Sequence, residues 1–356
     1  MKKIRLAIVD DSSFVRKVIQ RLFENEPTIE IVGSAATGEE LIKNLNEWQP
    51  DVITLDLSMP GMGGLKTLDH IIAWKRIPVI ILSTHSSKDA PLTIESLHRG
   101  AADFIDKQQY SLVDFDALRS VLLEKIKQLT SKTILHLQDE KNKASEKIEK
   151  IIEPVPVLME PKVPYEYEII LIGASTGGPP AIQYILEFLD ESLQIPAVIV
   201  QHMPPGFTAA FANRLNQNLH FNVKEASNGE SIKKDTIYIA PAGFHLIFKK
   251  QQNNVYLILT DKPNDCLHKP SIDILFESAA EVFGKNSIGI ILTGMGKDGA
   301  KGALMLYNKG AYTIAQDESS CTIFGMPKAA LLAGAIREML SLYQIPQRII
   351  QLLSKQ

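Results

Sequence analysis

Short apolar runs alternate with amphipathic segments along this chain, and this alternation limits the possible folds more than any other feature. From Ile4 to about Leu129 it predicts strand–helix units in a parallel sheet with helices on both faces. The predicted strands are Arg5–Asp10, Ile29–Ala35, Val52–Leu57, Val79–Thr84 and Asp103–Asp106. The first part of the chain is therefore predicted to be a (βα)5 domain of the α/β class.

The alternation resumes after Glu168 with strongly apolar strands predicted at Ile169–Gly173, Ala197–Gln201 and Ile288–Thr293. A turn rich in Gly or Pro and then a helical stretch follow each strand, which predicts a second α/β domain, doubly wound and mostly parallel. A hairpin-like insert is expected within it. Its predicted strands are Thr236–Ala240, His245–Lys249 and Val255–Thr260, with Asn253-Asn254 as the turn.

The two parts are separated by a segment that cannot form a core. Residues 139–150 mix Lys and Glu with hardly any apolar side chain, and prolines follow at positions 154, 156, 161 and 164. Such a segment buries too little surface to offset its ordering entropy, so it is predicted to be an extended linker. We predict a first domain at residues 1–130, a linker at 131–166 and a second domain at 167–356.

Charge and cysteine content limit the possible partners. The formal net charge of −3 and the lack of a basic stripe argue against binding to nucleic acid or anionic lipid. Cys266 and Cys321 lack the paired spacing of a zinc site or a disulfide framework, which favours a reducing compartment. The apolar stretch near the N-terminus is too short for a signal peptide, and no run reaches membrane-spanning length. We expect a cytoplasmic protein without membrane insertion, with a monomer as the default.

Three carboxylates are predicted to meet at one edge of the first sheet. Asp10 and Asp11 lie at the end of the first strand and Asp56 near the end of the third, and the carboxyl ends of parallel strands converge on one crevice. Such a cluster repels itself unless a hard divalent cation binds between its oxygens, and Mg²⁺ fits best. A carboxylate can also accept a phosphoryl group, so Asp56 is the candidate acceptor.

Two further polar residues follow strands of the same sheet. Ser83 offers a hydroxyl at the end of the fourth strand, and Lys107 offers a cation at the end of the fifth. Each alone could be an ordinary solvated residue, but the set at the carboxyl ends of strands favours a site. Together with the Ser-Met-Pro-Gly-Met-Gly-Gly loop at Ser58 to Gly64, these residues resemble a response-regulator receiver domain.

The receiver resemblance implies a flavodoxin-like fold that is phosphorylated on Asp56 by a histidine kinase. The implied Mg²⁺ ligands are Asp10, Asp11, Asp56 and the backbone carbonyl of Ser58. The implied switch residues are Ser83, Lys107 and Phe104. Gln108 stands where the family usually has proline.

Ser175 lies in Gly-Ala-Ser-Thr-Gly-Gly, directly after an apolar strand. Its small neighbours permit a tight turn from strand to helix, which exposes the hydroxyl beside free backbone N–H groups. The motif matches the G-x-S-x-G nucleophile elbow, but a Gly-rich turn after a strand could equally hold the phosphate of a cofactor. The motif by itself leaves both interpretations open.

His202 follows the next apolar strand and Asp298 follows a later one. If the strands are parallel, a hydroxyl, an imidazole and a carboxylate emerge at one edge, where they can form a hydrolytic relay. Taken singly, His202 could be a hydrogen-bonded residue at a strand end, and Asp298 could be the N-cap of a helix. A capping role and a catalytic role are compatible, and a hydrolase is the leading interpretation.

Several segments of the second part resemble the catalytic domain of the chemotaxis receptor methylesterase family, CheB. They are Gly173–Gly178, Gln201–Leu215, His268–Asp273, Thr293–Ala300 and Phe324–Ala329. With the receiver-like part in front, the resemblance spans nearly the whole chain apart from the linker. Ala242 stands where that family more often has glycine.

The CheB resemblance implies a phosphorylation-activated protein-glutamate methylesterase that also deamidates specific glutamines. The implied substrates are methyl-accepting chemotaxis receptors, and the implied phosphodonor is the chemotaxis histidine kinase. Ser175 would be the nucleophile, His202 the general base and Asp298 the carboxylate that orients the imidazole. Thr176 and the backbone N–H of Met295 would lie near the developing oxyanion, and this domain would need no cofactor.

Two other interpretations are open at this point. The second domain could bind a nucleotide or a partner without hydrolysis, but Asp190 and Glu191 are too near the Gly-rich turn to meet a ribose hydroxyl, and Gln194 is neutral. Cys266 and His268 could form a nucleophile pair, but no Gly-rich turn or strand end accompanies them. A DNA-binding output domain fits this large, acidic-to-neutral α/β segment least.

Overall fold

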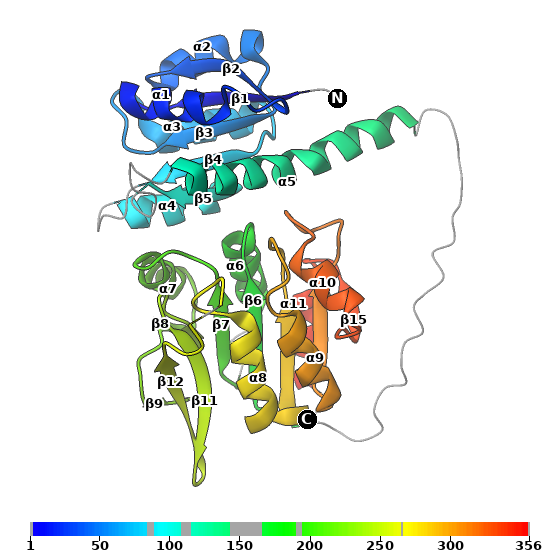
Figure 1. The fold of residues 1–356 in the computed structure, drawn as a ribbon. Coiled ribbons are helices and arrows are strands. Elements are labelled where there is room, and N and C mark those ends of the chain that lie inside the picture. The colour runs from blue at the N-terminus through cyan, green and yellow to red at the C-terminus, as the bar shows by residue number, and fades with distance from the viewer. Residues whose placement is uncertain are drawn as a thin grey trace. The chain divides into compact units, whose positions relative to one another are not determined.

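A computed structural model describes residues 3–83, 89–107, 115–142, 166–189, 194–264 and 266–354 of the chain. The chain divides into two compact units, Met1–Glu153 and Pro154–Gln356, and each is described by itself (Figure 1). Over the described residues, no helix is both long and apolar enough to span a membrane.

In the described part of the first unit, five parallel strands form one sheet in the order β2-β1-β3-β4-β5, which is the flavodoxin-like order. The strands are β1 (Ile4–Val9), β2 (Ile29–Ala35), β3 (Val52–Asp56), β4 (Val79–Ser83) and β5 (Asp103–Asp106). The helices are α1 (Ser13–Phe23), α2 (Gly38–Trp48), α3 (Gly63–Trp74), α4 (Asp89–His98) and α5 (Phe115–Asn142). The predicted (βα)5 architecture is confirmed.

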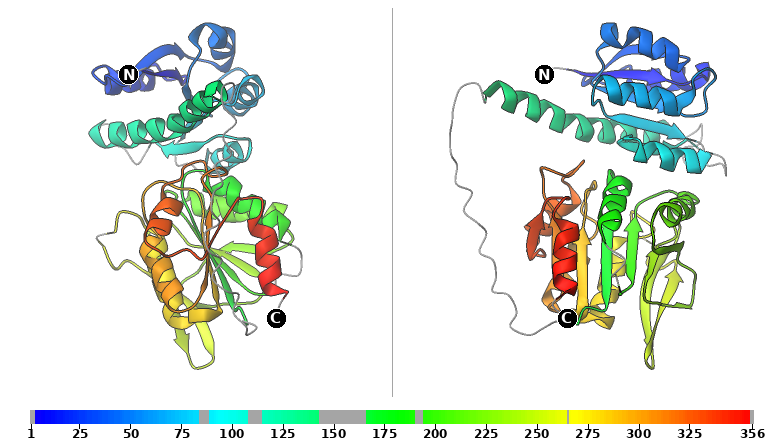
Figure 2. Two further views of the ribbon diagram at one scale, coloured as in Figure 1. Left: turned by 90° about the vertical axis from the view of Figure 1, so that its right-hand side faces the viewer. Right: turned by 180° about the vertical axis from the view of Figure 1, so that it is seen from behind.

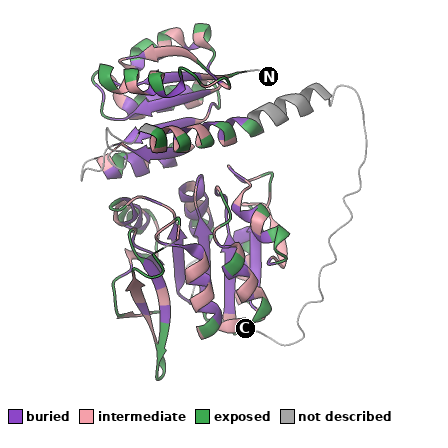
Figure 3. Cartoon of the chain, viewed as in Figure 1, coloured by how far each residue is buried: buried purple, intermediate pink, exposed green. Residues whose placement is uncertain are grey.

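Local sequence explains where these elements begin and how they pack. The side chain of Ser12 accepts a hydrogen bond from the Val15 N–H at 3.4 Å and so caps α1, as Thr37 caps α2 through the Glu40 N–H. Every residue of β3 and β4 is buried, as expected of central parallel strands covered on both faces (Figure 3). The carboxyl ends of these strands are thereby held by a rigid core.

Helix α5 continues to Asn142, so its last turns overlap the segment predicted as a linker. Residues 143–165 of that segment lie outside the described residues, as does Gln108. The predicted domain boundaries therefore stay a prediction.

In the described part of the second unit, seven parallel strands form a sheet in the order β15-β14-β13-β6-β7-β10-β8. They are β6 (Ile169–Ala174), β7 (Ala197–Gln201), β8 (Asn222–Glu225), β10 (Thr236–Ile239), β13 (Ser287–Ile291), β14 (Tyr312–Gln316) and β15 (Glu338–Leu340). The helices are α6 (Gly178–Phe188), α7 (Phe207–Asn218), α8 (Ile272–Val282), α9 (Ala300–Asn308), α10 (Met326–Leu332) and α11 (Ile345–Leu353).

The helices of this unit cover both faces of its sheet, as a doubly wound fold requires. Helices α8 and α9 pack against each other on one face, and α6 packs with α11 on the other (Figure 2). After β6 the chain builds outward through β7, and it later returns to add β13 on the opposite side of β6. The carboxyl ends of β6 and β13 therefore form the topological switch point, which is where such folds bind ligands.

The predicted insert is partly wrong. Strand β10 was expected to join it, but β10 pairs in parallel with β7 and β8, and its residues are all buried within the main sheet. The insert consists of β11 (His245–Gln251) and β12 (Asn254–Thr260), joined at Gln252 and Asn253, with β9 (Glu230–Ser231) on its edge. Proximity in sequence had suggested a hairpin strand, whereas burial on both faces is what assigns β10 to the parallel sheet.

Candidate functional site

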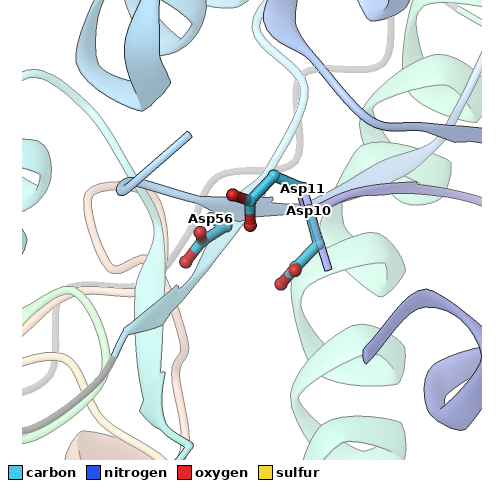
Figure 4. A group of neighbouring side chains, drawn as sticks. All are labelled: Asp10, Asp11 and Asp56. Atoms are coloured by element: carbon cyan, nitrogen blue, oxygen red, sulfur yellow. The ribbon is translucent and has the colours of Figure 1, made fainter. Parts of the chain in front are cut away.

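The acidic cluster of the first unit forms as predicted. Carboxylate oxygens of Asp10, Asp11 and Asp56 all lie within 4.8 Å of one another (Figure 4). Asp10 and Asp56 are buried, whereas Asp11 is exposed. Oxygen ligands of this kind suit a hard divalent cation, so the residues present fit Mg²⁺.

Lys107 supplies the positive charge that this cluster needs. Its Nζ donates to Asp10 Oδ2 at 2.7 Å and to Asp56 Oδ1 at 2.8 Å. Burial raises the pKa of the Asp56 carboxyl above its ordinary value, although Lys107 opposes the shift. Burial by itself would lower the pKa of Lys107, but Asp56 and Asp10 outweigh it and raise that pKa. Lys107 therefore stays charged and bridges the two buried carboxylates.

Ser83 lies at the same edge of the first sheet, and Phe104 lies within it. In the register of the sheet, Asp56 on β3 is opposite Leu82, so Ser83 is one residue further along the neighbouring strand. The buried Ser83 Oγ accepts a hydrogen bond from Thr93 Oγ1 at 2.6 Å. The Phe104 ring on β5 is buried. Ser83 thus accompanies the cluster and is tied to α4 through Thr93.

Ser175 lies where β6 turns into α6, at the predicted position. Its N–H donates to Thr293 O at 3.1 Å, and its carbonyl accepts from the Gly178 N–H at 2.8 Å. The turn passes through Gly177 at a φ of 76°, a left-handed conformation that glycine adopts without strain. A Cβ on Gly294 would lie 2.8 Å from Ser175 Cβ, so only glycine lets the loop after β13 lie against Ser175.

The two predicted oxyanion residues lie on these two loops. Thr176 directly follows Ser175 and is buried, and its carbonyl accepts a hydrogen bond from Thr293 Oγ1 at 3.0 Å. Met295 directly follows Gly294 and is half-buried. The close approach of Gly294 to Ser175 brings the Met295 peptide into the neighbourhood of the serine.

His202 and Asp298 come together from the strands on either side of β6. His202 Nε2 lies 2.8 Å from Asp298 Oδ2, and the imidazole is almost wholly buried. A carboxylate oxygen can only accept, so Nε2 carries a proton and donates it to Asp298. Among the described residues, Nδ1 has no hydrogen-bond partner, so Ser175 Oγ does not hydrogen-bond to His202 in this structure. Serine proteases use the two nitrogens in the opposite sense, with the carboxylate on Nδ1.

Asp298 is anchored at the N-terminus of α8. Its oxygens accept hydrogen bonds from His202 Nε2, Ser271 Oγ at 2.8 Å, Ile272 N at 2.7 Å, and Asp273 N and Gly299 N at 3.1 Å each. Burial by itself would raise the pKa of Asp298, but His202 and these N–H groups outweigh it and hold the pKa well below its ordinary value. The carboxylate is therefore ionised and fixed in place before any substrate binds.

Three residues outside the predicted catalytic set contact this site. Gln201 Nε2 donates to Ser175 O at 2.8 Å and to His202 O at 3.1 Å, which ties the serine turn to the end of β7. The His268 ring stacks on His202 with ring centroids 4.1 Å apart. Ser271 holds Asp298. All three lie within the segments that resemble the CheB catalytic domain, and this location was the signal in the sequence that could have indicated a role.

Together, fold and site define a two-domain α/β protein. A flavodoxin-like domain with an acidic, lysine-bridged cluster precedes a doubly wound domain whose serine, histidine and aspartate follow neighbouring strands, as in serine hydrolases. The model of the response regulator receiver domain matches residues 6–117, and the model of CheB methylesterase matches residues 170–349. The chain belongs to the CheB methylesterase family.

Relatives of similar length match this chain over nearly its full length. A protein of Halalkalibacterium halodurans, named protein-glutamate methylesterase/protein-glutamine glutaminase, is 38% identical over 98% of both chains. A protein of Thermotoga maritima with the same name is 37% identical, also over 98% of both. The crystal structure of the Thermotoga maritima CheB methylesterase catalytic domain covers 52% of this chain and 98% of its own, at 41% identity and a TM-score of 0.51.

Proposed function

We propose that the chain is a phosphorylation-activated protein-glutamate methylesterase that hydrolyses glutamyl methyl esters on methyl-accepting chemotaxis receptors. The same acyl chemistry would deamidate specific receptor glutamines, with ammonia as the leaving group. Family membership and the names of the full-length relatives support the reaction class. The hydrogen bond of 2.8 Å between His202 and an anchored Asp298, on strands flanking that of Ser175, is the observation that carries the proposal.

In the proposed reaction, Ser175 Oγ attacks the ester carbonyl while His202 Nδ1 takes the hydroxyl proton. Asp298 stabilises the imidazolium that forms, and the N–H groups around Met295 and Thr176 stabilise the oxyanion. The bond from carbon to methoxide then breaks, and His202 returns the proton so that methanol leaves. Water attacks the acyl-serine by the same route, which releases glutamate and free Ser175.

The first unit is proposed to control this reaction. Asp56 would accept a phosphoryl group from the chemotaxis histidine kinase, and the carboxylates of Asp10, Asp11 and Asp56 would hold the Mg²⁺. The bound metal would neutralise charge that develops on the phosphoryl oxygens. In this proposal the unphosphorylated receiver domain restrains the Ser175 site, and phosphorylation releases it.

Replacement of the proposed nucleophile tests the reaction. Ser175→Ala should abolish methanol release from methylated receptor, because it removes the hydroxyl that forms the proposed acyl intermediate. The matched control is Ser227→Ala, which changes an exposed serine in a loop and should keep full turnover. Thermal unfolding of both variants establishes that the fold is intact. Near-normal turnover in folded Ser175→Ala would remove the triad assignment.

A further inference from the structure

His245 is a buried histidine that the proposed reaction does not use. It begins β11 and is wholly inaccessible to solvent. Its Nε2 lies 3.1 Å from Pro263 O, and its Nδ1 lies 3.2 Å from the Ser271 N–H. A carbonyl can only accept and a backbone N–H can only donate. The ring is therefore neutral, with its proton on Nε2 and its lone pair on Nδ1 turned toward Ser271.

Ser271 connects this ring to the candidate active site. Its backbone N–H is held by His245, and its Oγ donates to Asp298 Oδ1 at 2.8 Å. Ser271 is also the N-cap of α8, so its position sets that of the next two peptide N–H groups, which donate to the same carboxylate at 2.7 and 3.1 Å. Asp298 in turn holds His202 through Oδ2.

We infer that His245 is a positioning residue for the reaction at Ser175. It fixes Ser271 at the start of α8, and that helix end fixes Asp298, which orients the imidazole of His202. The inference rests on the proposed function, since it assigns a role in that reaction. A ring that served only as packing would need neither nitrogen to form a hydrogen bond. In His245, Nε2 donates to Pro263 O and Nδ1 accepts from the Ser271 N–H.

The test compares two substitutions of opposite design. His245→Phe keeps a buried ring but removes the acceptor for the Ser271 N–H. His245→Asn gives up ring volume but offers an amide oxygen close to the place of Nδ1. Because a small misplacement of catalytic groups can cost on the order of 100-fold, we expect His245→Phe to lower kcat about 10- to 100-fold with little change in KM. His245→Asn should recover most of that loss, although its smaller side chain makes it the less stable variant.

A spectroscopic signal reports the same contact without turnover. In the full chain, the Nε2 proton shared by His202 and Asp298 should give a downfield proton NMR signal, identified by its loss in Asp298→Asn. This signal should shift or broaden in His245→Phe and persist in His245→Asn. If His245→Phe does not fold, His245→Leu takes its place in both measurements, because leucine also lacks an acceptor for the Ser271 N–H.

Two outcomes would overturn the inference: a folded His245→Phe with unchanged kcat and an unchanged signal, or an activity order that follows stability, with phenylalanine above asparagine. Ser175→Ala is measured alongside. If that variant keeps turnover, the proposed function fails. If it is inactive while His245→Phe behaves like the unsubstituted chain, the inference alone fails.

Discussion

At the scale of single residues, the site depends most on the ionised carboxylate of Asp298. Backbone N–H groups, the Ser271 hydroxyl and His202 all donate to it, so the side chain at this position must accept every one of these hydrogen bonds. Only a carboxylate offers enough lone pairs for this arrangement. Its lowered pKa means that it serves as a fixed anion rather than as a proton carrier.

Asp298→Asn should therefore damage both activity and stability. The amide N–H₂ would replace one of the two oxygens, and at either position it would face groups that donate to Asp298, so the orientation of the His202 ring would no longer be enforced. In a serine-protease triad the equivalent change costs about 10⁴-fold in kcat, and we expect a loss of that order here, measured by methanol release. Asp235→Asn, at an exposed position with a φ of 55° that asparagine tolerates, is the matched control. A loss of less than about 10-fold in folded Asp298→Asn would contradict the assigned role.

Ser175, His202 and Asp298 could be predicted because each directly follows a strand, in a short motif with small neighbours. Parallel strands bring such positions to one edge whatever the details of packing. The roles of Ser271 and His245 could not be predicted in this way. Their hydrogen bond joins residues 26 positions apart and depends on how β11 packs against α8, which no local pattern specifies.

At the scale of secondary-structure elements, the junction of β11 and α8 is the support of the active site. The parallel arrangement of the central strands was predictable, since apolar runs with helical stretches between them specify a parallel sheet. The place of β10 was not predictable, because four residues of alternating polarity fit a strand of an antiparallel hairpin as well as a strand of the parallel sheet. Its pairing is decided by burial on both faces, which is a tertiary property.

This junction should make the second unit sensitive to acid. Burial lowers the pKa of His245 below its ordinary value of 6.5, and nearby Lys269 acts in the same direction, while Pro263 O, Asp298 and Asp261 oppose the shift. Between the lowered folded value and 6.5, the unfolded chain binds more protons, so the free energy of unfolding falls as the pH drops through this window. It levels off below the folded pKa.

Amide hydrogen exchange in α8 can measure this dependence. Both tryptophans, Trp48 and Trp74, lie in the first unit, so tryptophan fluorescence does not report on the second. Protection of the α8 amides should decrease as the pH falls below 6.5, after correction for intrinsic exchange rates, and the decrease should be smaller in His245→Asn. Equal pH dependence in the two proteins would show that His245 is not the responsible group.

At the scale of the whole molecule, a receiver domain with the proposed phosphoacceptor Asp56 and a CheB methylesterase domain share one polypeptide. Covalent linkage gives the two units a high effective concentration for each other, so even a weak interaction can regulate. A charged and proline-rich stretch between them was predictable from composition. How the first unit affects the second was not, because that coupling depends on surfaces that no sequence motif describes.

Removal of the first unit tests the direction of this control. A chain that begins at Tyr165 should show higher basal methanol release than the full chain without phosphodonor, because the proposed restraint is lost. Thermal unfolding establishes that the fragment is folded. Unchanged or lower activity in a folded fragment would argue against restraint by the receiver domain.

The central claim is that phosphorylation at Asp56 controls ester hydrolysis at Ser175. The most direct measurement is methanol release from methylated receptor by the full chain, with Mg²⁺ and with or without a small-molecule phosphodonor. We predict turnover that rises with the phosphodonor, no such rise in Asp56→Asn, and no turnover in Ser175→Ala under either condition. A rise that persists in Asp56→Asn, or methanol release that does not require Ser175, would contradict the account.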